Sequence, residues 1–241
     1  MDTKSAAAAV VGARHVRAGR NGQDAAAAWS DGDTGAIVVC DGCSAGAYSE
    51  LGARLAAQLA IRCLRDALAT VRPRDVWPAV RDVIGSELAA LADQMLGDRA
   101  QIVHDHFLFT IVAAARRGDE LAVWALGDGG YRIGDRTRVL GPFADNQPPY
   151  LGYDLLGDPQ RAHVEVTDAD AGLAIVATDG AVELGLAQFG SRRLVEHPDA
   201  LRRQLAIAAR AVERVAWDDQ RIERTPAALQ DDGAVAILRW R

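Results

Sequence analysis

The sequence predicts an α+β fold built mainly on antiparallel sheet. Three observations carry this prediction: short apolar runs of strand length, three longer segments with helical periodicity, and an element order in which strands and helices come in groups. Regular alternation of strand and helix would indicate a parallel sheet, and it is missing here. A chain of 241 residues suits one domain, so we expect residues 1–241 to form a single domain, with residues 1–9 as a short tail or a first strand.

The expected strands are short runs of apolar residues, several of them rich in the Val and Ile that favour pleated surfaces. Asp31-Gly32 stands between two such runs and predicts a hairpin turn. Residues 141–157 contain three prolines and predict an irregular surface loop. The expected strands are residues 6–12, 25–29, 36–40, 107–115, 121–126, 173–178 and 234–240.

Three segments have the apolar spacing of amphipathic helices. In residues 49–69, Leu51, Leu55 and Leu59 recur every fourth residue. Residues 77–95 place apolar side chains at steps of three and four, and early prolines are tolerated there. Residues 201–212 repeat this pattern on a smaller scale. Each segment therefore has one apolar face to bury.

Charge and cysteine content exclude several classes of protein. The formal net charge of −6 and the pI near 5.4 oppose binding to nucleic acid or to an anionic membrane, because both need a positive field. Three cysteines are too few and too odd in number for a secreted disulfide framework. No apolar run is long enough to span a membrane. We therefore expect a cytoplasmic protein.

Aspartates at the ends of the expected strands are the candidate functional residues. Any single Asp-Gly pair is most simply a turn signal, and Asp31-Gly32 fits that interpretation. The group is harder to dismiss, because strands of one layered core end on common rims and can aim several carboxylates into one small volume. Such carboxylates repel one another unless a cation is bound. The pattern comprises Asp41-Gly42, Asp128-Gly129, Asp179-Gly180, Asp231-Asp232-Gly233 and Asp24 ahead of a strand.

The chemistry of these ligands indicates which cation would bind. Oxygen ligands without a set of histidines select hard ions, so we expect Mg²⁺ or Mn²⁺ rather than Zn²⁺. Cys40 and Cys43 form a C-x-x-C pair, but no second pair completes a zinc site. Two hard ions that share a water would lower its pKa and present hydroxide to a phosphorus centre.

Several of these motifs together resemble the type 2C protein phosphatases, which are metal-dependent serine/threonine phosphatases. The resemblance runs from about Val10 to the end of the chain and implies a four-layer α-β-β-α sandwich, with two mostly antiparallel sheets flanked by helices. Each motif is weak alone, but they occur in the family's order. They are Gly12-Ala13-Arg14-His15 to Gly19-Arg20-Asn21-Gly22-Gln23-Asp24, Ile37 to Gly42, Ser49 to Ala53, Ala125 to Gly129, Ala177 to Gly180 and Asp231 to Val235.

The resemblance also assigns roles to single residues. It implies that Asp41 bridges two Mn²⁺ or Mg²⁺ ions, that hydroxide between them is the nucleophile, and that no covalent phosphoenzyme forms. The Gly42 carbonyl, Asp179 and Asp231 would complete the first metal site, with Asp232 in the place of a family Asn. By the same resemblance, Asp24 would hold the second ion through water, and Asp128 would serve a third, weaker ion together with Asp179.

Two departures from the family pattern affect the catalytic prediction. The arginine that grips the substrate phosphate is shifted by one position, which makes Arg20 the expected catalytic arginine and Arg17 the alternative. Cys43 stands where some members carry a histidine proposed as the general acid. Asp41, Asp179 and Arg20 are thus the expected catalytic residues.

The expected substrates are phosphorylated proteins, and the expected counterpart is a Ser/Thr protein kinase. Two alternatives stay open. One is a catalytically silent relative that binds phosphoproteins or regulates partners. The other is a different carboxylate–metal hydrolase such as a phosphodiesterase, although the acidic net charge disfavours a nucleic-acid substrate.

Overall fold

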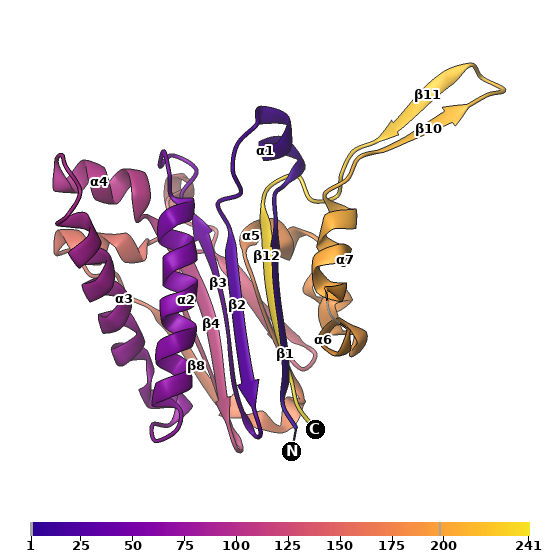
Figure 1. Ribbon diagram of the computed structural model, residues 1–241. Helices are drawn as coiled ribbons and strands as arrows, with labels where there is room; N and C mark the ends of the chain where they lie inside the picture. Colours follow the sequence, from indigo (N-terminus) through magenta and orange to yellow (C-terminus); the bar gives the residue numbers. More distant parts are fainter. Residues whose placement is uncertain (1, 198) are drawn as a thin grey trace.

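The protein forms four layers in the order helix, sheet, sheet, helix, as the computed structural model shows for residues 2–197 and 199–241 (Figure 1). Two five-stranded sheets pack face to face, and neighbouring strands within each sheet pair antiparallel in the described part of the chain. The α+β class and the sandwich arrangement expected from the sequence are confirmed.

Each sheet has its own strand order. The first sheet is ordered β2 (Ala25–Asp31), β3 (Thr34–Gly42), β4 (Phe109–Arg117), β5 (Glu120–Leu126) and β8 (His163–Asp168). The second is ordered β1 (Lys4–Val10), β12 (Gly233–Arg239), β9 (Leu173–Ala177), β6 (Gly129–Ile133) and β7 (Arg136–Leu140). Of the two alternatives for the N-terminal residues, the strand is found, because β1 pairs along its whole length with β12.

Helices cover the outer face of each sheet (Figure 1). The first sheet is covered by α2 (Glu50–Ala67), α3 (Trp77–Ala92) and α4 (Arg99–His106). The second is covered by α5 (Asp179–Glu183), α6 (Arg193–Glu196) and α7 (Ala200–Ala208), while the short α1 (Ala13–Ala18) lies at one end of the sheets. Short 3-10 helices are Pro73–Asp75, Ala144–Asn146, Leu151–Leu156, Ala169–Ala171 and Leu186–Gly190.

Three hydrophobic clusters hold the layers together, which is why the central strands of each sheet are apolar on both faces. Val39 and Val176 belong to the cluster between the sheets. Trp77 and Trp124 stack with ring centroids 5.7 Å apart in the cluster under α2 and α3. Leu205 packs in the third cluster, between the second sheet and its helices.

Two sequence expectations need correction. The helix expected at residues 201–212 is α7, which ends at Ala208. Val212 instead begins β10 (Val212–Ala216), which pairs with β11 (Arg221–Thr225) in a hairpin that projects from the body (Figure 1). The segment 141–157 is not only surface loop, because its 3-10 helix Leu151–Leu156 buries Leu151 and Leu155 in the cluster under the helices. The hairpin turn at Asp31-Gly32 is confirmed, since Asp31 pairs with Thr34.

None of the helices in the described part of the chain is long and apolar enough to cross a membrane.

Candidate metal centre and active site

The topology brings the predicted aspartates to one end of the sandwich. Asp24 precedes β2 and Asp41 lies near the end of the antiparallel β3, so both belong to the same end of the first sheet. Asp179 follows β9 and Asp231 precedes the antiparallel β12, which puts them at one end of the second sheet. Asp128 lies on the connection from β5 to β6, where the chain crosses between the sheets.

Strand alternation turns two of these carboxylates inward. Ile37 and Val39 point into the cluster between the sheets, and Asp41 continues that face of β3. On β2, Ala26 and Ala28 pack against the same cluster, and Asp24 is in phase with them. Apolar residues therefore fill the space between the sheets along its length, and carboxylates replace them where the strands reach the rim.

A cavity of about 130 Å³ lies at this end, and all five predicted aspartates line it. Gly42 lines it too, at the end of β3. None of the lining residues in the described part of the chain is Lys or Arg. The acidic side chains around the cavity are Asp24, Asp41, Asp128, Asp179, Asp231 and Asp232.

Burial places Asp24 in an environment that disfavours its charge. The side chain is largely buried, and burial is the main reason that its pKa rises from 3.8 to about 8. The Thr178 hydroxyl opposes this shift by donating a 2.6 Å hydrogen bond to Oδ2 of Asp24, whereas the negative charge of Asp232 adds to it.

Asp41 and Asp128 show the same effect. Burial, followed by repulsion from Asp24 and Asp179, raises the pKa of Asp41 well above its usual range. Burial and then the charge of Asp179 raise the pKa of Asp128 to about 6. Desolvated carboxylates that face one another are stabilised in their charged form by a bound cation.

The donor set fits hard divalent ions. It consists of carboxylate oxygens and the Gly42 carbonyl, which are the ligands that Mg²⁺ and Mn²⁺ prefer. Raised pKa values and the lack of a lysine or arginine among the described lining residues both indicate that positive charge at this cavity comes from a ligand. Asp24, Asp41, Asp128, Asp179, Asp231 and Gly42 are thus able to hold such ions.

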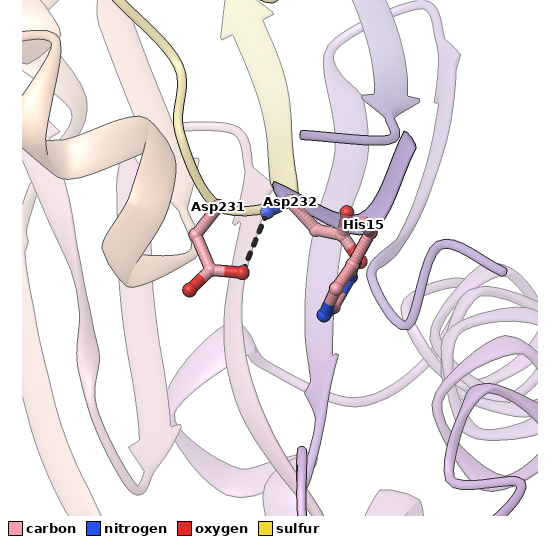
Figure 2. Close-up of side chains that lie close together, drawn as sticks. All are labelled: His15, Asp231 and Asp232. Atoms are coloured by element: carbon pink, nitrogen blue, oxygen red, sulfur yellow. Dashed lines mark hydrogen bonds and ion pairs between the residues drawn. The ribbon is translucent and has the colours of Figure 1, made fainter. Parts of the chain in front are cut away.

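Asp231 and Asp232 adopt different environments although they are neighbours. The Asp231 side chain is 52% exposed, and its Oδ1 accepts a 2.9 Å bond from the Asp232 amide (Figure 2). Asp232 is 4% exposed, and its carboxylate lies beside the ring of His15, while that of Asp231 points away from the pair (Figure 2). Both carboxylate oxygens of Asp232 accept hydrogen bonds from the protein, which leaves Asp231 the more available of the two for a ligand.

Several lining residues were not expected at the site from the sequence, among them His15 and Gln23. Gln23 stands next to Asp24 and could have been noticed by that position alone. His15 is a single histidine without ligand spacing, and no sequence signal connects it with Asp232, which is 217 residues away.

The predicted arginines lie away from the cavity. Neither Arg17 nor Arg20 is among the residues that line it, and Arg17 donates a hydrogen bond to the side chain of Gln230. Arg14 comes nearer to an acidic residue of the site, with Nη1 4.0 Å from Oδ2 of Asp231. The role of Arg20 stays a prediction.

One wall of the cavity comes from the proline-rich segment after Gly141. Pro148 and Tyr150 line the cavity, and so does Cys43, which directly follows the end of β3. Burial, and then a hydrogen bond with Cys43, raises the pKa of the Tyr150 phenol far above its usual range, so the hydroxyl stays neutral. This wall therefore offers an uncharged surface next to the carboxylates.

Comparison with known proteins identifies the family. The family model described as "Protein phosphatase 2C" matches residues 11–183, which is well over half of the chain. The chain therefore belongs to the protein phosphatase 2C family, whose members are metal-dependent serine/threonine phosphatases. Its family places it among the phosphoprotein phosphatases, which are hydrolases. No curated protein matches the sequence.

Solved structures share the fold at low sequence identity. The serine/threonine phosphatase Stp1 from Staphylococcus aureus superposes with a TM-score of 0.63 and 12% identity, over 100% of this chain and 96% of that one. The serine/threonine phosphatase PstP/Ppp of Mycobacterium tuberculosis gives a TM-score of 0.61 and 15% identity over 100% of both chains. The catalytic domain of PstP in complex with two manganese ions gives 0.60 and 14%, over 99% and 98%. At these identities the structural similarity establishes the fold alone.

Proposed function

We propose that this chain hydrolyses phosphoserine and phosphothreonine monoesters in proteins with the help of two Mn²⁺ or Mg²⁺ ions held at the cavity. The observation that supports this proposal is the convergence of five aspartates from both sheets on one cavity that has no lysine or arginine among its described lining residues. Bound cations would relieve the repulsion among these carboxylates and would also attract a phosphate dianion.

Each ligand has an assigned place in this proposal. Asp41 serves both ions, and the Gly42 carbonyl, Asp179 and Asp231 complete the first site. When bound, the ions supply positive charge for the phosphate oxygens and lower the pKa of a water that they share. Asp24 acts on the second site through water, and Asp128 with Asp179 serves a third, weaker ion.

The protein's own groups orient these ligands and shape the substrate site. The hydroxyl of Thr178 fixes the Asp24 carboxyl by a 2.6 Å hydrogen bond. Pro148 and Tyr150 give the cavity a neutral wall that suits the uncharged side chain bearing the phosphate. Arg20 remains the proposed phosphate-binding arginine, with Arg17 as the alternative, although neither lines the cavity.

The proposed partners are phosphorylated proteins, with a Ser/Thr protein kinase as the counterpart, and the proposed location is the cytoplasm. The net charge of −6 supports a protein rather than a nucleic-acid substrate, because a polyanion would be repelled.

The proposal is tested by turnover of p-nitrophenyl phosphate and of phosphothreonine peptides with and without Mn²⁺. We expect Mn²⁺-dependent hydrolysis that falls by about 100-fold or more in Asp41→Asn and Asp179→Asn, since both remove a charge from the proposed metal sites. Asp31→Asn is the matched control, because Asp31 also precedes a glycine but lies at the β2–β3 turn. It should match the parent.

Two results would contradict the proposal. If the parent shows no Mn²⁺-dependent turnover above the Asp41→Asn variant, the chain is a silent relative. If it hydrolyses bis(p-nitrophenyl) phosphate but not the monoester, it is a phosphodiesterase.

A further inference from the structure

The buried carboxylate of Asp232 joins three separate segments at the cavity. Its Oδ1 accepts a 2.7 Å hydrogen bond from the amide of Gly12, and its Oδ2 accepts one of 2.7 Å from the amide of Gln23. Oδ2 also lies 2.8 Å from Nδ1 of His15. A carboxylate that also accepts two backbone N–H bonds acts as the acceptor, so Nδ1 of His15 carries a hydrogen and donates the hydrogen bond to Asp232.

The two amides held by Asp232 lie next to proposed metal ligands. Gln23 directly precedes Asp24, so the bond to its amide fixes the backbone that carries Asp24. Gly12 packs so closely on Asp231 that an added Cβ would stand 2.1 Å from the carbonyl carbon and oxygen of Asp231. Asp232 therefore sets the spacing between the segments that carry Asp24 and Asp231.

Gln23 extends this connection to the strand that carries Asp41. Its carbonyl oxygen accepts a 3.2 Å hydrogen bond from the amide of Gly42, which follows Asp41 at the end of β3. Its side-chain amide donates a 2.8 Å bond to the hydroxyl of Ser49, just before α2. One buried network thus spans both sheets at the rim.

His15 orients the carboxylate at the centre of this network. The histidine is 9% exposed, and the helix α1 that carries it is held by two backbone bonds, Ala13 to Leu229 and Arg14 to Gln230. His15, Asp231 and Asp232 have ligand atoms within 4.8 Å of one another, but the Asp232 oxygens already accept three hydrogen bonds. This arrangement favours a positioning role over a metal site of its own.

We propose that His15 and Asp232 form a clamp that positions the metal ligands, with His15 holding the Asp232 carboxylate in the orientation that fixes the Asp24 and Asp231 segments. The clamp raises the affinity of the cavity for divalent metal without touching the ion. This inference rests on the proposed function, because it assumes that Asp24 and Asp231 hold metal. Groups that orient metal ligands in this way change metal affinity by about 10- to 100-fold when they are removed.

The test is isothermal titration of the full chain with Mn²⁺ alone, without substrate. His15→Phe keeps a ring but removes the donor, and we expect it to weaken Mn²⁺ binding by about 10- to 100-fold with the number of bound ions unchanged. His15→Asn places an amide nitrogen close to the position of Nδ1 and should restore binding to within about threefold of the parent. His104→Asn, on the exposed side of α4, is the control and should bind as the parent does.

A double variant separates the clamp from a general loss of stability. Because His15 acts through Asp232, the variant His15→Phe/Asp232→Asn should bind Mn²⁺ no more weakly than the weaker of the two single variants, and urea unfolding confirms that each variant is folded. Additive losses would overturn the inference. So would parent-like binding by His15→Phe, or the loss of one bound ion in both His15 variants, which would make His15 a ligand. If the parent itself binds no Mn²⁺, the proposed function fails and the clamp with it.

Discussion

Replacing Asp24 by Asn is predicted to stabilise the metal-free protein, although Asp24 is a proposed metal ligand. Burial raises the pKa of Asp24 from 3.8 to about 8, so the folded state keeps a proton that the unfolded state releases. The stability contributed by this proton is fully present below pH 3.8 and is lost as the pH rises toward 8. Asparagine has the same shape, accepts the Thr178 hydrogen bond and does not titrate.

The magnitude follows from proton linkage. One proton held only by the folded state makes the unfolding free energy fall by up to about 1.4 kcal/mol per pH unit. Relative to the parent, Asp24→Asn should therefore gain about 2–3 kcal/mol of stability between pH 5 and pH 7 without metal. Because the charge of Asp24 also raises the pKa of Asp41, Asp24→Asn relieves part of that shift too, and the difference between the two proteins includes this contribution.

The assay is urea unfolding of the parent and of Asp24→Asn at several pH values, in chelator and in excess Mn²⁺. Metal that binds only the folded state stabilises it by about 2.7 kcal/mol at a hundred times the dissociation constant. We expect this gain in the parent and a much smaller one in the variant. Mn²⁺ should therefore reduce or reverse the difference in unfolding free energy between the two proteins. A stability difference that stays constant between pH 5 and pH 7 would refute the reasoning, and Asp31→Asn should show no such pH-dependent difference.

Three further predictions concern the surroundings of the site and the core. Thr178→Val should lose about 1–3 kcal/mol in urea unfolding, because the amide of Ala234, 2.9 Å from the Thr178 hydroxyl, loses its acceptor; a Thr178→Ser variant that is equally destabilised would contradict this. Gly180→Ala should abolish Mn²⁺ binding measured by calorimetry, since its Cβ would stand 2.1 Å from the Asp232 carbonyl oxygen. Parent-like binding would contradict this, because the backbone would then accommodate the Cβ without displacing the metal ligands. Trp124→Ala should cost about 3–5 kcal/mol in the same unfolding assay, whereas Trp217→Ala, 82% exposed, should change stability by less than about 0.5 kcal/mol; equal effects would contradict the assigned packing.

The sequence predicts the core strands well because their apolar runs are long and continuous. All seven expected strands are found with small shifts at their ends, as for the expected residues 36–40 inside β3. The strands β6, β7 and β8 were missed, as was the projecting hairpin of β10 and β11. β6 begins with two glycines, β7 is mostly exposed, and β8 alternates over only six residues, so none of them has the apolar run that reveals a buried strand.

The candidate site was predictable where it follows from strand ends and not where it depends on contacts between distant segments. Asp41 and Asp179 each follow an apolar run, and that local pattern places them at a rim. The pairing of His15 with Asp232 and the burial of Asp232 arise only when β1, β2 and β12 meet at that rim. The position of Arg20 outside the cavity likewise depends on the path of the loop after α1, which has no periodic signal.

The central claim, that the aspartates at this rim form a two-metal centre, is tested most directly by anomalous diffraction at the manganese edge from crystals grown with Mn²⁺. We predict two strong peaks inside the cavity, about 3.5–4 Å apart, with Asp41 between them. Crystals of Asp41→Asn should lose at least one peak. An absence of anomalous density in the cavity of the parent, in Mn²⁺ that supports turnover, would contradict the account.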